Sequence, residues 1–121
     1  MIRRLNEQRA VSRFPNVDFR VLVEPEEMYD AGRLYAHITI APGASIAFHK
    51  HEDEMESFYV LRGPCRVEDN AHTEQLEAGD MLITGDGESH AVYNDGKEPI
   101  ELIASIISSK QGIAGKSVMN S

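Results

Sequence analysis

GASIAFHKHEDEMESFYVLRG, residues 43–63, is the stretch of the sequence that decides the fold. It carries His49 and His51 in a run of β-forming residues, and side chains two apart in a strand point to the same face. Both imidazoles can therefore reach one point in space. The polar residues 52–55 favour a turn, which would bring Glu56 back beside the two histidines on a neighbouring strand. The pattern predicts a β-structure that gathers ligands for a cation.

The rest of the chain continues in short β-like runs separated by Gly, Pro, Asn and Asp. Such runs at close spacing predict an all-β sandwich or barrel. The best helix candidate, residues 24–29, would make about one turn. A length of 121 residues favours one domain, which we place at residues 1–110, followed by a C-terminal tail at 111–121. The expected β-runs cover residues 19–23, 34–40, 46–51, 57–61, 65–67, 81–84, 90–93 and 100–107.

Charge and cysteine content exclude several kinds of partner and site. The formal net charge of −8 would repel phosphate backbones, so we expect no nucleic-acid partner. Cys65 is the only cysteine, which excludes an intrachain disulfide and a thiolate metal cluster and fits a reducing compartment. The N-terminal residues lack the apolar segment of a signal peptide, and the apolar runs are too short to span a bilayer. We therefore expect a cytoplasmic protein without membrane association.

A third histidine, His90, extends the ligand set. It follows a Gly-Asp-Gly turn at residues 85–87 and enters another expected strand. Three imidazole nitrogens and one carboxylate oxygen suit a borderline divalent ion better than Ca²⁺ or Mg²⁺, which prefer oxygen donors. The residues alone leave the carboxylate open, because Glu52, Asp53 and Glu54 compete with Glu56 for that role.

Two motifs in this chain resemble those of the cupin superfamily. The first cupin motif is Gly, five residues, His-x-His, three or four residues, Glu, six residues and Gly, and residues 43–63 match every fixed position. The second is Gly, five residues, Pro-x-Gly, two residues, His, three residues and Asn. Residues 79–94 match it except that Gly85 stands in place of the proline. The resemblance implies a double-stranded β-helix, the jelly-roll barrel of cupins, with residues 52–54 in a solvated loop. It also implies a metal site formed by His49, His51, Glu56 and His90.

The resemblance further implies one divalent transition metal per chain: Mn, Fe, Zn, Ni, Co or Cu. Four protein ligands leave open coordination positions, which suit catalysis better than a structural role. Our first hypothesis is a metal-dependent enzyme that acts on a small carboxylate- or carbonyl-bearing metabolite, as a dioxygenase, decarboxylase, isomerase or cyclase. The alternative is a non-catalytic metal- or small-ligand-binding module or sensor. A purely structural barrel is a third hypothesis, and the complete ligand set argues against it.

Strand parity predicts which side chains share the pocket with the ligands. Phe58 and Val60 should face inward with Glu56, and Val92 should share the face of His90. His37 is a further candidate, as a residue that supports a ligand or contacts substrate. A position on the barrel exterior or in a dimer interface is equally consistent with its sequence context.

Three apolar side chains should face out of the barrel and need cover. Tyr59 and Leu61 have the parity opposite to that of Phe58, and Tyr93 has the parity opposite to that of His90. A sheet that exposes them would favour a homodimer, because large exposed apolar patches usually mark interfaces. Small single-domain cupins are commonly dimers, so the resemblance implies the same assembly.

Overall fold

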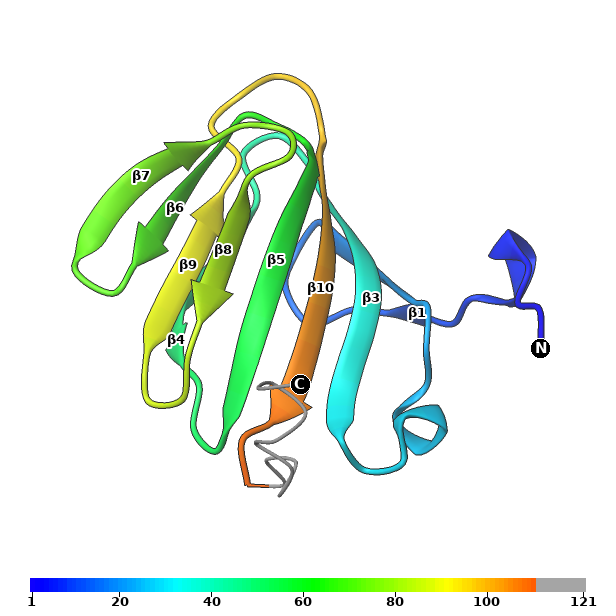
Figure 1. Ribbon diagram of the computed structural model, residues 1–121. Coiled ribbons are helices and arrows are strands. Elements are labelled where there is room, and N and C mark those ends of the chain that lie inside the picture. The colour runs from blue at the N-terminus through cyan, green and yellow to red at the C-terminus, as the bar shows by residue number, and fades with distance from the viewer. Residues whose placement is uncertain (111–121) are drawn as a thin grey trace.

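The computed structural model of the protein describes residues 1–110, and it shows two antiparallel β-sheets that enclose one core (Figure 1). The all-β prediction is confirmed. The tail expected at residues 111–121 lies outside the described residues. None of the helices described is long and apolar enough to cross a membrane. The strands are β1 (Ala10–Val11), β2 (Val17–Val21), β3 (Gly32–Ile40), β4 (Ser45–Lys50), β5 (Glu54–Arg62), β6 (Cys65–Asp69), β7 (His72–Leu76), β8 (Met81–Thr84), β9 (Ser89–Tyr93) and β10 (Ile100–Ser108).

The larger sheet has six strands in the order β1-β2-β3-β10-β5-β8. The long strands β3, β10 and β5 lie at its centre, and β10 pairs antiparallel with both neighbours. Their side chains alternate between the core and the outer face. Phe58 and Val60 are buried, whereas Tyr59 is 41% and Leu61 44% exposed, so the parity predicted for this strand is confirmed.

The smaller sheet has four strands in the order β4-β9-β6-β7. The pairing of β4 with β9 places His49 directly opposite His90, which brings two candidate ligands together from distant parts of the chain. Strand β7 was not expected, because its residues are mostly polar and exposed. Such a composition suits an edge strand, which packs few side chains against the core. His72 begins this strand and is exposed.

The hydrophobic core fills the space between the two sheets. Inward residues from the six-stranded sheet, such as Ile38 and Leu102, meet inward residues of the four-stranded sheet, such as Val67 and Val92. One end of this interior is polar, because Glu56 from one sheet and His90 from the other are both buried there. The fold therefore holds the candidate ligands between two rigid layers.

There are two short 3₁₀ helices among the described residues: η1 (Leu5–Glu7) precedes β1, and η2 (Pro25–Met28) lies between β2 and β3. The single turn expected at residues 24–29 is confirmed as η2. Pro25 favours its start because the proline ring fixes a helical φ angle. Tyr29 ends it in the left-handed conformation, with a φ angle of 51°.

Candidate metal centre

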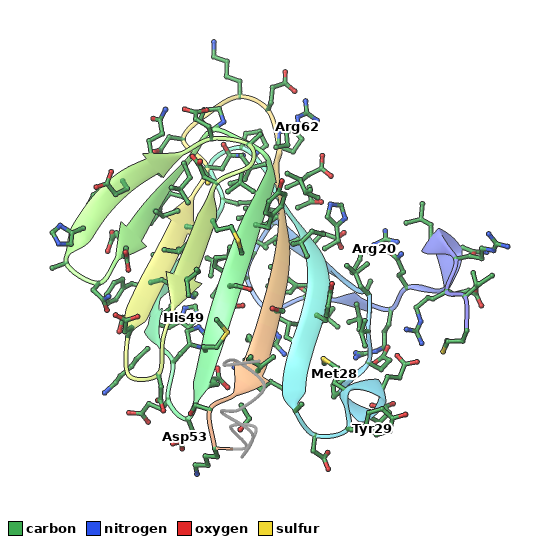
Figure 2. The ribbon with its side chains drawn as sticks, viewed as in Figure 1. Arg20, Met28, Tyr29, His49, Asp53 and Arg62 are labelled. Carbon is green, nitrogen blue, oxygen red and sulfur yellow. The ribbon has the colours of Figure 1, made fainter. Side chains whose placement is uncertain are left out.

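The four residues expected to bind metal lie together between the two sheets. His49 is in β4, His51 follows that strand directly, and His90 is in β9 of the same sheet. Glu56 lies in β5, which belongs to the opposite sheet. Glu56 therefore lies on a strand and close to the histidines, as expected, but that strand is not a neighbour of β4, because the connection after His51 crosses from one sheet to the other. Figure 2 labels His49 and, at the tip of this connection, Asp53.

The ligand atoms have the spacing of neighbouring ligands on one ion. Nε2 of His51 and Nε2 of His90 lie 2.9 and 3.1 Å from the same oxygen, Oε1 of Glu56. The two nitrogens are 3.1 Å apart. One ligand atom from each of these residues and His49 lies within 4.8 Å of all the others. Two ligands at right angles on an ion, with bonds of about 2.1 Å, would be roughly 3.0 Å apart.

Each imidazole is held at its Nδ1 atom, which leaves Nε2 for the cluster. Carbonyl and carboxylate oxygens only accept hydrogen bonds, so His49 and His51 must carry a proton on Nδ1. In the neutral rings Nε2 is then a bare acceptor, and Nε2 of His51 faces another acceptor, Oε1 of Glu56. A cation between them removes this repulsion, so the donor set fits a divalent metal ion. The Nδ1 partners, each at 2.6 Å, are the Ala47 carbonyl for His49, the Glu54 carboxylate for His51 and the Thr84 hydroxyl for His90.

Glu54 is part of the site and not of a solvated loop. Its carboxylate accepts the hydrogen bond from Nδ1 of His51 and also receives two hydrogen bonds from the Arg33 guanidinium, both at 2.7 Å. Its side chain is only 15% exposed. We expected residues 52–54 to be solvated, which holds for Glu52 and Asp53 but is wrong for Glu54. The reason is that β5 begins at Glu54 and carries it back over the cluster.

Burial and hydrogen bonding shift the pKa values of the cluster in opposite directions. Burial alone would raise the pKa of Glu56, but the contacts with the imidazoles of His51 and His90 outweigh it, and the pKa is lowered. Without a cation, protonated His51 would donate a hydrogen bond from Nε2 to Glu56, and this contact raises the pKa of His51. A bound metal ion would take the place of that proton. Burial lowers the pKa of His49, which favours its neutral form. A neutral imidazole and an ionised carboxylate are the forms that bind metals.

The turn between β8 and β9 supports the cluster through its backbone. Gly87, with a φ angle of 85°, donates its N–H to the carbonyl of His51 at 2.7 Å. A non-glycine residue would be strained there. Gly85, where cupins usually have proline, donates its N–H to the Glu88 carboxylate at 2.7 Å. Proline has no N–H to donate, so the departure from the motif has a local structural use.

The cluster opens into a cavity of about 150 Å³. Phe58 lines it as expected and stacks on His90, with ring centroids 4.9 Å apart. Two guanidinium groups, those of Arg13 and Arg33, also lie along it. The remaining lining is apolar and comes from Phe14, Phe19, Leu34, Ile46 and Ile106.

Three residues that we expected in the lining lie elsewhere. Val60 and Val92 do point inward, but they belong to the hydrophobic core and do not line the cavity. Val60 is two residues beyond Phe58 in β5, and Val92 is two residues beyond His90 in β9. His37 lies on the outer face of β3, between the fully buried Ala36 and Ile38, and its Nε2 is 2.9 Å from Oε1 of Glu101.

Sequence reasoning missed several residues that contact the ligands or the cavity. Thr84 could have been found from its position in the sequence, because it ends an expected strand directly before the Gly-Asp-Gly turn at residues 85–87. Glu54 is three residues beyond His51, a spacing that allows contact across a tight turn. Arg13 and Phe14 gave no signal, because they reach the site only through the tertiary fold.

Comparison with known proteins agrees with this fold and site. The family model described as Cupin domain matches residues 36–106, so the expected resemblance is confirmed. An oxalate-binding protein of Thermotoga maritima is 38% identical over 91 residues, which cover 75% of each chain. The tetracenomycin polyketide synthase protein TcmJ of Streptomyces glaucescens is 28% identical, over 72% of this chain and 58% of that protein. The crystal structure of a predicted oxalate decarboxylase from Thermotoga maritima superposes with a TM-score of 0.81 and 34% identity, over 89% of this chain and 99% of that one. The expected double-stranded β-helix is therefore confirmed.

Proposed function

The chain belongs to the cupin family, and on that premise we propose that it binds one divalent transition metal ion and a small carboxylate of the oxalate class. The proposed metal ligands are His49, His51, Glu56 and His90. The observation that carries the proposal is the spacing of 2.9 to 3.1 Å between three candidate ligand atoms, Nε2 of His51, Nε2 of His90 and Oε1 of Glu56. Similarity to an oxalate-binding protein supports the choice of carboxylate. The bound metal can be Mn, Fe, Zn, Ni, Co or Cu, all of which accept this donor set.

The residues around the cluster suit the capture of a small anion. A divalent ion held by these residues would act as a Lewis acid toward the oxygen atoms of a small anion. Phe14 and Phe58 give the cavity apolar walls that limit the entry of water. Arg13 places positive charge on the same cavity in a chain whose formal net charge is −8, whereas the charge of Arg33 is paired with Glu54. A small anion is therefore attracted locally although the whole protein would repel it.

Turnover of the bound compound is the second candidate function. The open coordination positions favour it, as they did for the enzyme hypothesis drawn from the sequence. A decarboxylase, isomerase or cyclase would also need a residue that gives or takes a proton. Among the described residues that line the cavity, the ionisable side chains are three of the proposed ligands, His49, His51 and Glu56, and two arginines, and arginine stays charged in proteins. This composition favours binding without turnover. Among the reactions considered, that of an O₂-dependent dioxygenase depends least on a side chain that transfers protons.

Calorimetric titration with oxalate tests the proposal. The protein is reconstituted with Mn(II), Fe(II) under nitrogen or Zn(II), and a metal-free sample serves as the control. We expect one oxalate per chain in at least one loaded form and no saturable binding to the metal-free protein. Equal affinity with and without metal would contradict the proposed site. Product and O₂-uptake assays on the same loaded samples, with oxalate, diketones and phenolics, separate turnover from binding.

We also propose that the protein is a homodimer formed through the outer face of the six-stranded sheet. Tyr59 and Met81 are cross-strand neighbours on this face, so the apolar side chains are contiguous. Tyr93, which we expected in the same patch, lies on the other sheet with the Arg66 guanidinium 4.0 Å from its ring centroid. Light scattering should give the mass of two chains, and Ile83→Glu should give that of one. A monomeric wild-type protein would refute the dimer. The exposed apolar residues of this face are Tyr35, Tyr59, Leu61, Met81, Ile83 and Ile107, which are 40 to 60% exposed.

A further inference from the structure

The segment between β1 and β2 brings an arginine to the rim of the metal cavity. Arg13 and Phe14 both line this cavity, and Arg13 is also exposed to solvent. Phe14 fixes the segment, because its ring centroid lies 6.5 Å from that of Phe19 and 6.2 Å from that of His49. The Phe14 carbonyl accepts a hydrogen bond from the Val17 N–H at 3.2 Å. The backbone that carries Arg13 is therefore anchored beside a candidate metal ligand.

The charge of Arg13 is not neutralised within residues 1–110. Its guanidinium makes no ion pair or hydrogen bond there, and its contact is with the face of Phe19, whose ring centroid is 5.9 Å away. Arg33, the other arginine of the cavity, is already bound by both oxygens of Glu54. A planar guanidinium that stacks on an aromatic ring keeps its N–H donors free for a carboxylate. Arg13 is therefore the cavity's available partner for an anion.

The cavity is small enough that a ligand bound at the cluster would also contact Arg13. A cavity of about 150 Å³ holds a molecule the size of benzene, with six non-hydrogen atoms, and oxalate has the same number. A ligand that fills this space from the metal ligands outward meets the rim. A second cavity of about 130 Å³ shares the lining residues Arg13, Arg33 and Leu34 with the first. Arg13 thus lies at the boundary between the metal cavity and this second cavity.

We propose that Arg13 is the residue that recognises the anionic group of the ligand and selects a dianionic carboxylate over a monoanionic analogue of the same size. This inference rests on the proposed function, since it assigns a ligand class to that same site. Arg13 lies before residues 36–106, the part of the chain that matches the family model, whereas the four metal ligands lie within it. The recognition element is therefore supplied by the N-terminal segment and not by the barrel motifs.

The test compares oxalate with oxamate, which replaces one carboxylate by a neutral amide. Both are titrated by calorimetry into Mn(II)-loaded wild type, Arg13→Gln and Arg20→Gln. Arg20→Gln is the matched control, because this substitution removes the same charge from a residue of β2 that does not line the cavity. Figure 2 shows Arg20 far from His49. Arg13→Lys keeps the charge without the planar fork and should recover part of the affinity.

We expect Arg13→Gln to weaken oxalate binding roughly 10- to 100-fold, as for the loss of a charged hydrogen-bond pair, and to reduce the preference for oxalate over oxamate by a similar factor. Affinity for Mn(II) itself should stay within about twofold of wild type, as should both anion affinities of Arg20→Gln. Wild-type affinity for oxalate in Arg13→Gln would overturn the assignment of Arg13 and leave the proposed function standing. Absence of oxalate binding by loaded wild type would overturn the proposed function and this inference with it.

Discussion

Replacement of Glu54 by alanine should weaken metal binding although Glu54 is not itself a ligand. The side chain accepts a 2.6 Å hydrogen bond from Nδ1 of His51 and is held by Arg33 at 2.7 Å. It thereby fixes which nitrogen of His51 carries the proton and how the ring is turned. Loss of such a partner typically costs 10- to 100-fold in metal affinity. We expect Glu54→Ala to lose about 100-fold in metal affinity, the upper end of this range, because the substitution also leaves Arg33 unpaired beside the site. This loss corresponds to about 2.8 kcal/mol of binding free energy.

Two further variants separate the effects of charge and hydrogen bonding. Glu54→Gln retains an oxygen that can accept from His51 but loses the charge, so we expect about a tenfold loss, or about 1.4 kcal/mol. Glu52→Gln is the matched control, because Glu52 is exposed and its ion pair is with Lys50 at 3.2 Å. Metal affinity is measured by competition with a chelator of known affinity. Equal affinities for Glu54→Ala and Glu52→Gln would refute the view that Glu54 positions His51.

Three other predictions follow from the site and the core. His51→Ala should lose the metal but keep its β-structure, because the core between the sheets is apolar. Metal analysis and circular dichroism measure the two effects. Unfolding of the whole variant protein would show that the metal is structural. The pKa of Glu54 is lowered to about 2, chiefly by the hydrogen bond from Arg33, so its contribution to stability is complete above its ordinary value of 4.5 and is lost as pH falls toward 2. Urea unfolding of wild type and Glu54→Gln should therefore differ most above pH 4.5, and a difference that grows in acid would contradict the ion pair. Phe58→Ala should cost about 3–5 kcal/mol of unfolding free energy, because the ring is buried and packs on His90; a loss below about 1 kcal/mol would place Phe58 outside the core.

Much of the fold and the grouping of the four candidate ligands was predictable because both depend on local spacing. Alternation along one strand identifies Phe58 as inward, and motif spacing distinguishes Glu56 from its acidic neighbours. The crossing between sheets was not predictable, since a short polar connection after His51 looks the same whether it joins paired strands or opposite layers. The roles of Glu54 and Arg13 were hidden for a related reason. Their polar side chains have no periodic signature, and only the tertiary fold shows that one lies behind a ligand and the other at the rim.

The metal content of the reconstituted protein is the most direct test of the central claim. Purified protein is stripped with a chelator, incubated with each candidate divalent ion, desalted and measured by elemental analysis, with Glu56→Ala treated in parallel. We expect one ion per chain for wild type with at least one of these metals, and a marked loss for the variant, which lacks the oxygen that both His51 and His90 approach. Fewer than about 0.1 ions per wild-type chain with every metal would contradict the proposed metal site.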